Sequence, residues 1–170
     1  GGAPFFVHVT YNAPHTPLQV PEEELSPFRE KGLFNEGVCR IYAMIRRMDR
    51  GVERILAALD RHGLEENTIV LFSSDNGAQF GGEGDECTTR VNCQYNGAKG
   101  TVYEGGIRVP LAIRWPAGLA GGRQVDRMAH FADWFPTLLH AAGVPVPAGP
   151  KLDGVDIWPV LLGQEGEVCE

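Results

Sequence analysis

Several features that define common protein classes are absent from these 170 residues. No apolar stretch reaches the roughly 20 residues that a membrane-spanning helix requires. The 15 Lys and Arg residues are outnumbered by 22 Asp and Glu residues, and the formal net charge is −7. A nucleic-acid-binding protein needs a basic face, so this balance argues against one. None of the four cysteines forms a C-x-x-C pair, which argues against a zinc ribbon or a thioredoxin-type site.

The first residues also lack the features of a natural N-terminus. The chain begins with Gly rather than Met, and it has no basic-then-apolar signal peptide. Residues 4–10 are apolar and β-branched instead, which predicts a strand buried on both faces. A chain that opens inside a strand is typical of a fragment. We therefore expect residues 1–170 to form a single partial domain.

What the sequence does contain is an alternation of strand and helix patterns. Apolar residues recur at steps of three and four from Val38 to His62, and Gly63 is a helix stop. A second buried strand is predicted over residues 68–73. A strand, a helix and a strand form a βαβ unit, so the fold class is α/β, with a mixed, mostly parallel sheet and flanking helices. The other expected elements are a strand over 109–115, a helix over 130–142 and a short closing helix or turn over 153–163. Residues 18–36 are rich in Pro, Glu and Gly and are expected to form a surface connection.

Three polar features follow the predicted strands or close the loop after them. His15 lies between Pro14 and Pro17, Asp75 and Asn76 follow the second strand, and Lys99 closes a Gly-rich segment. In open α/β sheets, ligands bind beyond the carboxyl ends of the strands. Carboxylate and amide oxygens are the ligands that calcium prefers. A lysine among glycines can approach an anion closely.

Each of these features also has an ordinary structural interpretation. Asp75-Asn76-Gly77 has the composition of a tight turn, Lys99 can be a solvated loop lysine, and His15 can bond to the backbone. Their combination favours a catalytic role, because hydrolysis of an anionic ester needs a metal site, a lysine and a histidine together. A metal and a lysine offset charge on the oxyanion, and a histidine donates a proton to the leaving oxygen.

Three ordered motifs resemble the sulfatase family of the alkaline-phosphatase-like superfamily. They are residues 13–21 (APHTPLQVP), 72–77 (FSSDNG) and 97–110 (GAKGTVYEGGIRVP). Residues 133–138 and 152–156 are similar to later family segments, so the resemblance spans essentially the whole chain. It is nearest to the arylsulfatase A/B-like enzymes. It implies a partial alkaline-phosphatase-like three-layer sandwich that forms the C-terminal part of a catalytic domain.

The resemblance also implies residue roles. Asp75 and Asn76 are expected to be two ligands of a calcium ion, with Mg²⁺ as the alternative metal. Lys99 is expected to bind the sulfate group, and His15 to contact the sulfate and assist departure of the alcohol. Both are thus expected to be catalytic and substrate-binding residues. Glu104 and Arg108 lie in the third motif and are read as structural.

The family's nucleophile motif, C/S-x-P-x-R, is absent from the 170 residues. Its Cys or Ser becomes formylglycine in family members, and we expect it in a segment that precedes this chain, together with further calcium ligands. The isolated chain is therefore predicted to be inactive. The alternatives are a degenerate homologue, a phosphoester or phosphonate hydrolase of the superfamily, and a non-catalytic module that binds sulfated glycans.

The substrate is expected to be a sulfated small molecule or glycan, with specificity residing in the variable segments 18–36 and 78–96. Family members are exported or lysosomal, so a periplasmic, secreted or lysosomal location is expected. A disulfide between Cys87 and Cys93 would agree with such a location, with two free thiols as the alternative.

Overall fold

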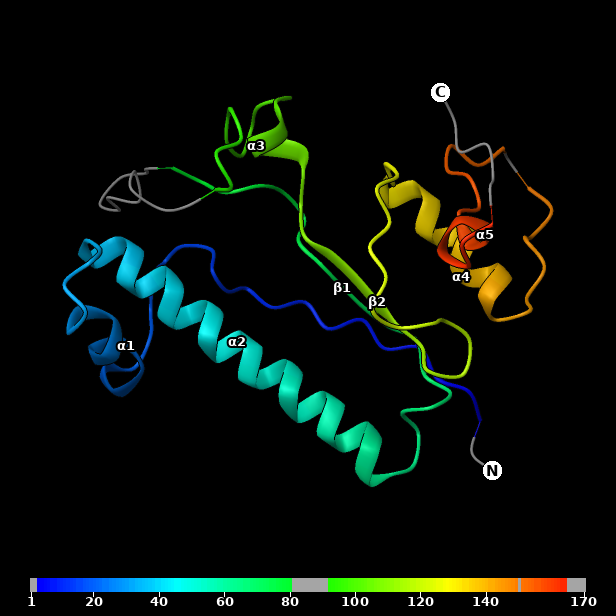
Figure 1. Cartoon of the computed structure of the whole chain (residues 1–170), viewed down its shortest axis with the longest axis horizontal. Helices are drawn as coiled ribbons and strands as arrows, with labels where there is room; N and C mark the ends of the chain where they lie inside the picture. The colour runs from blue at the N-terminus through cyan, green and yellow to red at the C-terminus, as the bar shows by residue number, and fades with distance from the viewer. Residues whose placement is uncertain (1–2, 81–91, 150, 165–170) are drawn as a thin grey trace. The chain divides into compact units, whose positions relative to one another are not determined.

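The computed structural model describes residues 3–80, 92–149 and 151–164 (Figure 1). The chain divides into two compact units, one of residues 1–65 and 71–113 and the other of residues 66–70 and 114–170. The elements in chain order are the helices α1 (Glu22–Arg29) and α2 (Glu36–Arg61), the strand β1 (Val70–Ser73), the helix α3 (Glu104–Ile107), the strand β2 (Leu111–Arg114), the 3₁₀ turn η1 (Phe131–Asp133) and the helices α4 (Trp134–Ala141) and α5 (Trp158–Leu161).

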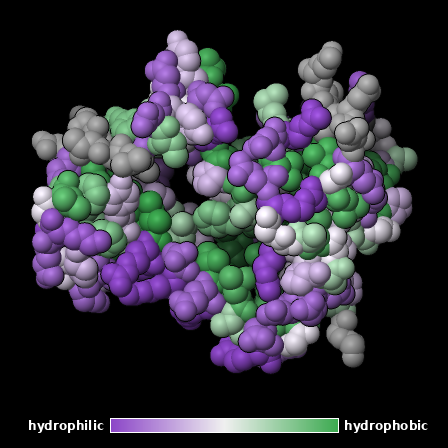
Figure 2. Space-filling view, in the orientation of Figure 1, coloured by the Kyte–Doolittle hydropathy of each residue, from purple (hydrophilic) through white to green (hydrophobic). Residues whose placement is uncertain are grey.

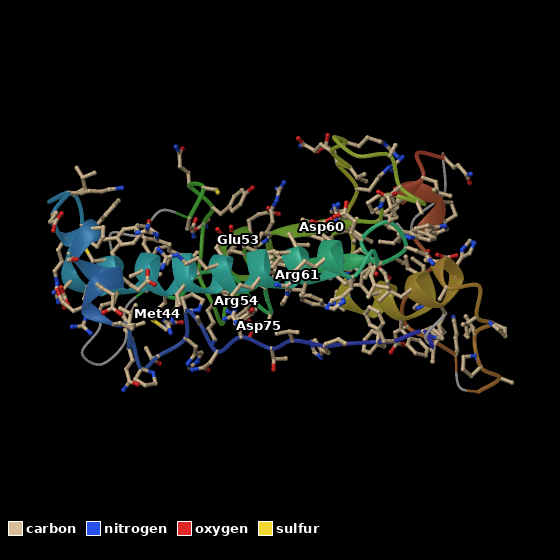
Figure 3. The ribbon with its side chains drawn as sticks, turned by 90° about the horizontal axis from the view of Figure 1, so that it is seen from below. Met44, Glu53, Arg54, Asp60, Arg61 and Asp75 are labelled. Atoms are coloured by element: carbon tan, nitrogen blue, oxygen red, sulfur yellow. The ribbon has the colours of Figure 1, made fainter. Side chains whose placement is uncertain are left out.

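The long helix α2 begins and ends where its sequence signals indicate. The Asn35 side chain caps its first turn by accepting a hydrogen bond from Val38 N at 3.0 Å. At the other end, Gly63 has a positive φ of 63°, and Leu64 N donates to Leu59 O at 2.9 Å. The helix predicted from Val38 to His62 is therefore confirmed. Charged side chains such as Glu53, Arg54, Asp60 and Arg61 extend from its exposed length (Figure 3).

The core of the first unit lies where α2 meets α1 and the segment before α1. Leu18 packs with Ile41 and Met44 in one cluster, and Leu25 packs with Cys39 and Ala43 in a second. The sequence predicted only a surface connection over residues 18–36, and α1 corrects that interpretation. The helix forms because Leu25 is buried against α2, although Pro27 lies inside it.

The two predicted strands 68–73 and 109–115 are both present, as β1 and β2, and they pair with each other. They run in opposite directions (Figure 1), and Ser73 Oγ at the end of β1 donates to Pro110 O before β2 at 3.1 Å. Pro110 precedes the first residue of β2, in keeping with the absence of a backbone donor in proline. Most of both strands belongs to the first unit.

The predicted strand over residues 4–10 is wrong. The structure assigns no strand to residues 3–10, which run as an extended segment beside α2, and the parallel βαβ pairing is not formed in the described residues (Figure 1). A strand requires hydrogen bonds to a neighbour, whereas β1 and β2 bond to each other. Phe6 is 85% exposed and Val7 is 67% exposed. They contribute to the apolar surface of the molecule, which Figure 2 maps by hydropathy.

The second unit is organised around α4 and α5. The helix predicted over 130–142 is confirmed, with Asp133 accepting from His130 N at 2.7 Å at its start. The buried Thr137 hydroxyl donates to Asp133 O and accepts from Ile157 N at 3.0 Å, which ties α4 to the segment before α5. No helix in the described part of the chain is both long and apolar enough to cross a membrane.

Candidate active site

The predicted metal-binding pair lies directly after β1. Asp75 is exposed and Asn76 is half-buried. Ser74 Oγ donates to Asn76 O at 3.0 Å, and Asn76 Nδ2 donates to Gly77 O at 2.9 Å. These bonds hold the backbone in a turn and orient the amide. The backbone bends at Asp75 and Asn76, in agreement with the turn interpretation, and the Asp75 side chain is exposed.

Lys99 is half-buried and lies on a second turn, formed by residues 98–101. Thr101 N and Thr101 Oγ1 both donate to Ala98 O, at 3.0 and 2.8 Å. Gly97 precedes this turn and Gly100 lies within it, with φ of 79° and 87°. Both values lie in the left-handed region that favours glycine, so the two glycines allow the tight course of the chain around Lys99.

Backbone hydrogen bonds join these two turns. Lys99 N donates to Ala78 O at 2.9 Å, and Gly77 N donates to Gly106 O at 2.9 Å. The residues immediately after Asn76 are thus bonded to Lys99 itself and to α3, which follows the Lys99 turn. The structure brings the predicted metal-binding turn and the predicted sulfate-binding lysine into one connected backbone assembly.

His15 is exposed on its loop. Its ring Nδ1 lies 2.7 Å from Thr16 O, and His15 N donates to Asn12 O at 2.8 Å. A proton on Nδ1 completes the first of these bonds, because a carbonyl oxygen only accepts. In the described residues, the hydrogen bonds of His15 go to Asn12 and Thr16 of its own loop and not to the turns that carry Asp75 and Lys99.

Both ends of the His15 loop, residues 11–18, are anchored on α2. On one side, Tyr11 lies over Gly51, where an added Cβ would come within 2.4 Å of the Tyr11 hydroxyl oxygen. On the other side, Leu18 is buried, and its carbonyl accepts from Arg40 Nη1 at 3.2 Å. The helix therefore determines where the exposed histidine is held.

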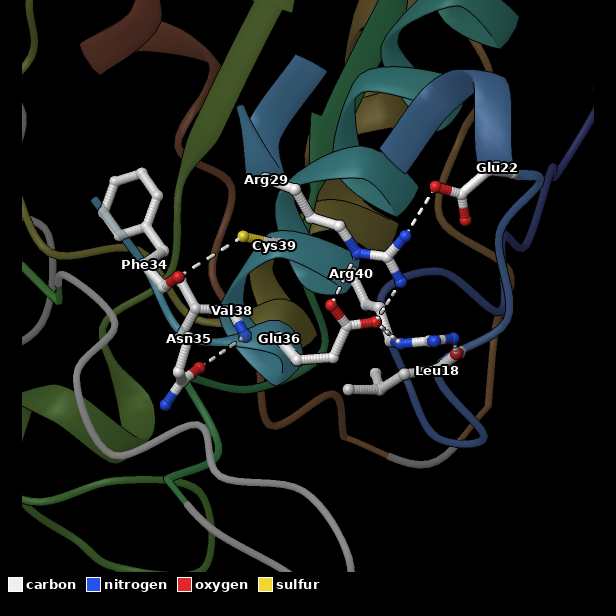
Figure 4. A network of polar contacts seen from close by, with 9 residues as sticks. All are labelled: Leu18, Glu22, Arg29, Phe34, Asn35, Glu36, Val38, Cys39 and Arg40. Carbon is white, nitrogen blue, oxygen red and sulfur yellow. Dashed lines mark hydrogen bonds and ion pairs between the residues drawn. The ribbon is translucent and has the colours of Figure 1, made fainter. Parts of the chain in front are cut away.

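Arg40 belongs to a charged network at the start of α2, drawn in Figure 4. Glu36 accepts from Arg40 Nε at 2.7 Å and also from Arg29, which contacts Glu22 at 2.5 Å. These hydrogen bonds from Arg29, and then from Arg40, lower the pKa of Glu36 from 4.5 to about 2. Glu36 therefore stays ionised and holds α1 and the His15 loop to one end of α2. Sequence reasoning missed this network because it treated residues 18–36 as a surface connection.

The donor set at Asp75 and Asn76 fits part of a hard-cation site. It offers one carboxylate and one amide oxygen, whereas calcium takes six to eight oxygen ligands. Among the described residues there is no group of three or more His, Cys, Asp or Glu side chains that would hold a metal ion. The two residues can thus contribute to a calcium site that other groups or water complete.

Two further expectations concern the same region. Glu104 and Arg108 form an ion pair at 2.9 Å, and the Arg108 guanidinium lies 5.0 Å from the centre of the Tyr95 ring. These contacts agree with the structural reading of both residues. The sequence left open either a disulfide or two free thiols at Cys87 and Cys93; Cys87 lies outside the described residues, and Cys93 is exposed.

Comparison with known proteins identifies the family. The family model for Sulfatase matches residues 2–144. The uncharacterised sulfatase YdeN of Escherichia coli (strain K12) is 37% identical over 161 residues, which are 93% of this chain and 27% of that protein. Steryl-sulfatase of Mus musculus is 35% identical over 164 residues, 94% of this chain and 25% of that protein. The chain belongs to the sulfatase family, and it spans about a quarter of the length of these relatives.

Solved structures confirm the fold class. Ps i-CgsB, crystallised in complex with k-i-k-neocarrahexaose, is 32% identical with a TM-score of 0.80 over 90% of this chain and 32% of its own. The phosphonate monoester hydrolase of Agrobacterium radiobacter is 35% identical with a TM-score of 0.59 over 76% of this chain and 23% of its own. The chain thus has the α/β, alkaline-phosphatase-like fold that the motifs predicted.

Proposed function

We propose that this chain is the later part of the catalytic domain of an arylsulfatase-like enzyme that hydrolyses sulfate esters. The observation that carries the proposal is the pair of hydrogen bonds from Lys99 N to Ala78 O and from Gly77 N to Gly106 O, each 2.9 Å long. They connect a cation-binding turn to an anion-binding lysine in a chain whose family is sulfatase. A site that neutralises a sulfate group needs positive charge of both kinds in one place.

Each residue then has a definite task. Asp75 and Asn76 supply two oxygen ligands to calcium, or to Mg²⁺ as the alternative metal. The cation, when bound, withdraws negative charge from the sulfate oxygens. Lys99 contributes a second positive charge toward the same group. His15 donates a proton to the departing alkoxide from Nε2, which requires the imidazolium form because Nδ1 donates to Thr16 O.

The nucleophile is proposed to lie outside these 170 residues, because the C/S-x-P-x-R motif does not occur in them. Formylglycine, where present, supplies the hydrated aldehyde that attacks sulfur. The chain by itself is accordingly proposed to be inactive. The natural gene product is proposed to act on a sulfated small molecule or glycan in the periplasm, outside the cell or in the lysosome.

The proposal is tested on the natural gene product that contains this sequence. Turnover of 4-nitrophenyl sulfate is measured with calcium and after chelation, and mass spectrometry searches for a formylglycine-containing C/S-x-P-x-R peptide. Calcium-dependent turnover together with the modified peptide supports the proposal. A product with neither property excludes sulfate ester hydrolysis by this mechanism.

A second candidate is a phosphonate or phosphate ester hydrolase, which the likeness to the Agrobacterium radiobacter enzyme favours. The Asp75-Asn76 pair distinguishes the two, because it resembles the sulfatase pattern rather than the histidine pairing of the phosphate-handling relatives. The same preparation is therefore assayed with 4-nitrophenyl phosphate and a phenylphosphonate ester. A higher kcat/KM for either than for 4-nitrophenyl sulfate would reverse the order of the candidates.

A further inference from the structure

Three glycines lie where the Asp75–Asn76 turn meets the Lys99 turn. Gly77 N donates to Gly106 O at 2.9 Å, and Gly105 N donates to Asn96 O at 2.7 Å. Gly105 and Gly106 are buried, although Ile107 beside them is 62% exposed. Gly105 and Gly106 are therefore buried because their backbone packs against other backbone. Apolar side chains contribute little to this burial.

The packing leaves no room for a side chain. A Cβ on Gly77 would lie 2.0 Å from Gly105 O, and a Cβ on Gly105 would lie 2.2 Å from Gly97 O. A Cβ on Gly106 would lie 2.2 Å from Thr101 O. Real Cβ contacts essentially never fall below 3.0 Å, and all three obstructing atoms are backbone atoms. A substitution at Gly77 must therefore move the Asp75–Asn76 turn away from α3, and one at Gly105 or Gly106 must move α3 away from the Lys99 turn.

The backbone angles do not explain these glycines. Gly97 and Gly100 have positive φ, but Gly77, Gly105 and Gly106 do not. An L-residue is thus allowed at these three positions by local conformation and excluded by neighbouring backbone atoms. Glycine is required because α3 packs closely against the Asp75–Asn76 turn at Gly77 and against the Lys99 turn at Gly105 and Gly106.

From this geometry we propose that Gly77, Gly105 and Gly106 are positioning residues that set the separation between the cation-binding turn and Lys99. The inference rests on the proposed function of those turns. Gly77 follows Asn76 directly, and Gly106 lies against the first and last residues of the Lys99 turn, since its added Cβ would lie 2.5 Å from Ala98 O as well as 2.2 Å from Thr101 O. Moving Gly77 or Gly106 away from the backbone that it packs against would change the distance between the proposed cation ligands and Lys99.

The test uses Gly77→Ala and Gly106→Ala in the natural gene product, with two matched controls. Gly121→Ala places its Cβ in open space, at a position without positive φ. Gly154→Ala creates an equally severe backbone clash, 2.1 Å from Ala132 O, in the other unit of the chain. The readouts are the melting temperature, the calcium Kd from titration with calcium chloride alone, and kcat and KM for 4-nitrophenyl sulfate.

We expect Gly77→Ala and Gly106→Ala to raise the calcium Kd roughly 10- to 100-fold, the usual effect of removing support around metal ligands. A displacement of about 1 Å lowers kcat by roughly 100-fold. Gly154→Ala is expected to lower the melting temperature as much while its calcium Kd stays with that of Gly121→Ala. If the site variants and Gly154→Ala lose stability alike and retain wild-type calcium Kd and kcat, the inference is overturned.

A milder pair of variants decides the question if the alanine variants do not fold. Thr101→Val removes the hydroxyl that donates to Ala98 O and accepts from Ala98 N, whereas Thr101→Ser keeps it. We expect kcat to fall in the first and to be restored in the second; equal kcat in both overturns the inference. A wild-type protein that neither binds calcium nor hydrolyses the sulfate ester overturns the proposed function itself, and this outcome is recognised before any variant is made.

Discussion

Arg29 and Glu36 form a bidentate ion pair. Arg29 Nε donates to one carboxylate oxygen of Glu36 at 2.7 Å, and Nη2 donates to the other at 2.6 Å. The fork of the guanidinium matches the two oxygens, so the pair fixes orientation as well as distance. It joins the last residue of α1 to the first residue of α2, which positions the segment that carries Leu25 against the long helix.

The lowered pKa of Glu36 makes a pH dependence of stability predictable. Its pKa falls from 4.5 to about 2 on folding, so its contribution is present above pH 4.5 and is lost as the pH falls toward 2. Both partners are partly exposed, so solvent screening keeps the effect small. We expect Glu36→Gln to flatten the acid side of the stability–pH curve, measured by chemical unfolding. Glu53→Gln on the same helix should leave the curve unchanged, and an unaltered Glu36→Gln curve contradicts the prediction.

Glu24 is predicted to contribute more to stability, because it is buried. Only 6% of it is exposed, and it pairs with Arg50 and lies 3.8 Å from Arg47. We expect Glu24→Ala to destabilise the protein by about 1–2 kcal/mol. The loss stays below that of a fully buried pair because both arginines can return to water. Unfolding in urea measures it, with the neighbouring Glu23→Ala as control. Equal losses in both variants would show that the buried ion pair contributes nothing specific.

The contact between Tyr11 and Gly51 is predicted to couple the His15 loop to α2. Replacing a glycine inside a helix by alanine normally gains about 1 kcal/mol. Here the new Cβ would meet the Tyr11 hydroxyl oxygen at 2.4 Å, so we expect the gain to be lost. In a Tyr11→Ala background the same substitution should recover it. A double-mutant cycle on the free energy of unfolding measures this coupling, and strict additivity would contradict it.

The metal-binding role proposed for Asp75 predicts a loss of calcium affinity without a loss of stability. Asp75→Asn keeps the size of the side chain and removes its charge, so we expect the calcium Kd of the natural gene product to rise at least roughly 10-fold. The melting temperature without calcium should not change, because Asp75 is exposed. Asp60→Asn on α2 is the matched control. A calcium Kd shared by Asp75→Asn, Asp60→Asn and wild type would remove Asp75 from the site.

The proton-donor role proposed for His15 predicts that the effect of its removal depends on the leaving group. A good leaving group such as 4-nitrophenolate departs with little help from a proton donor, whereas an alkoxide must be protonated as it departs. We therefore expect His15→Ala to lower kcat for an alkyl sulfate by roughly 100-fold or more and for 4-nitrophenyl sulfate much less. His62→Ala at the end of α2 serves as control. The same fractional loss for both substrates would indicate a role in binding only.

Local signals were sufficient for several elements. The helical spacing from Val38 and the glycine stop at Gly63 predicted α2 closely, because caps and amphipathic periodicity are encoded within one helix. The β-branched run 68–73 also predicted β1. Residues 4–10 carry an equally apolar pattern and yet form no strand, since a strand also depends on a neighbour that its own residues do not specify.

The candidate site likewise has features that the sequence predicted and features that it did not. The residue types and order of His15, Asp75, Asn76 and Lys99 were readable from the chain, and they determined the family and the chemistry to propose. Their positions in space could not be read from the sequence. That Gly77 meets Gly106, and that Arg40 holds Leu18 at the base of the His15 loop, depends on contacts between segments far apart in the sequence. The order of residues along the chain established which groups are available. Which of them share a backbone assembly depended on the fold, because close approach is a property of two chain segments at once.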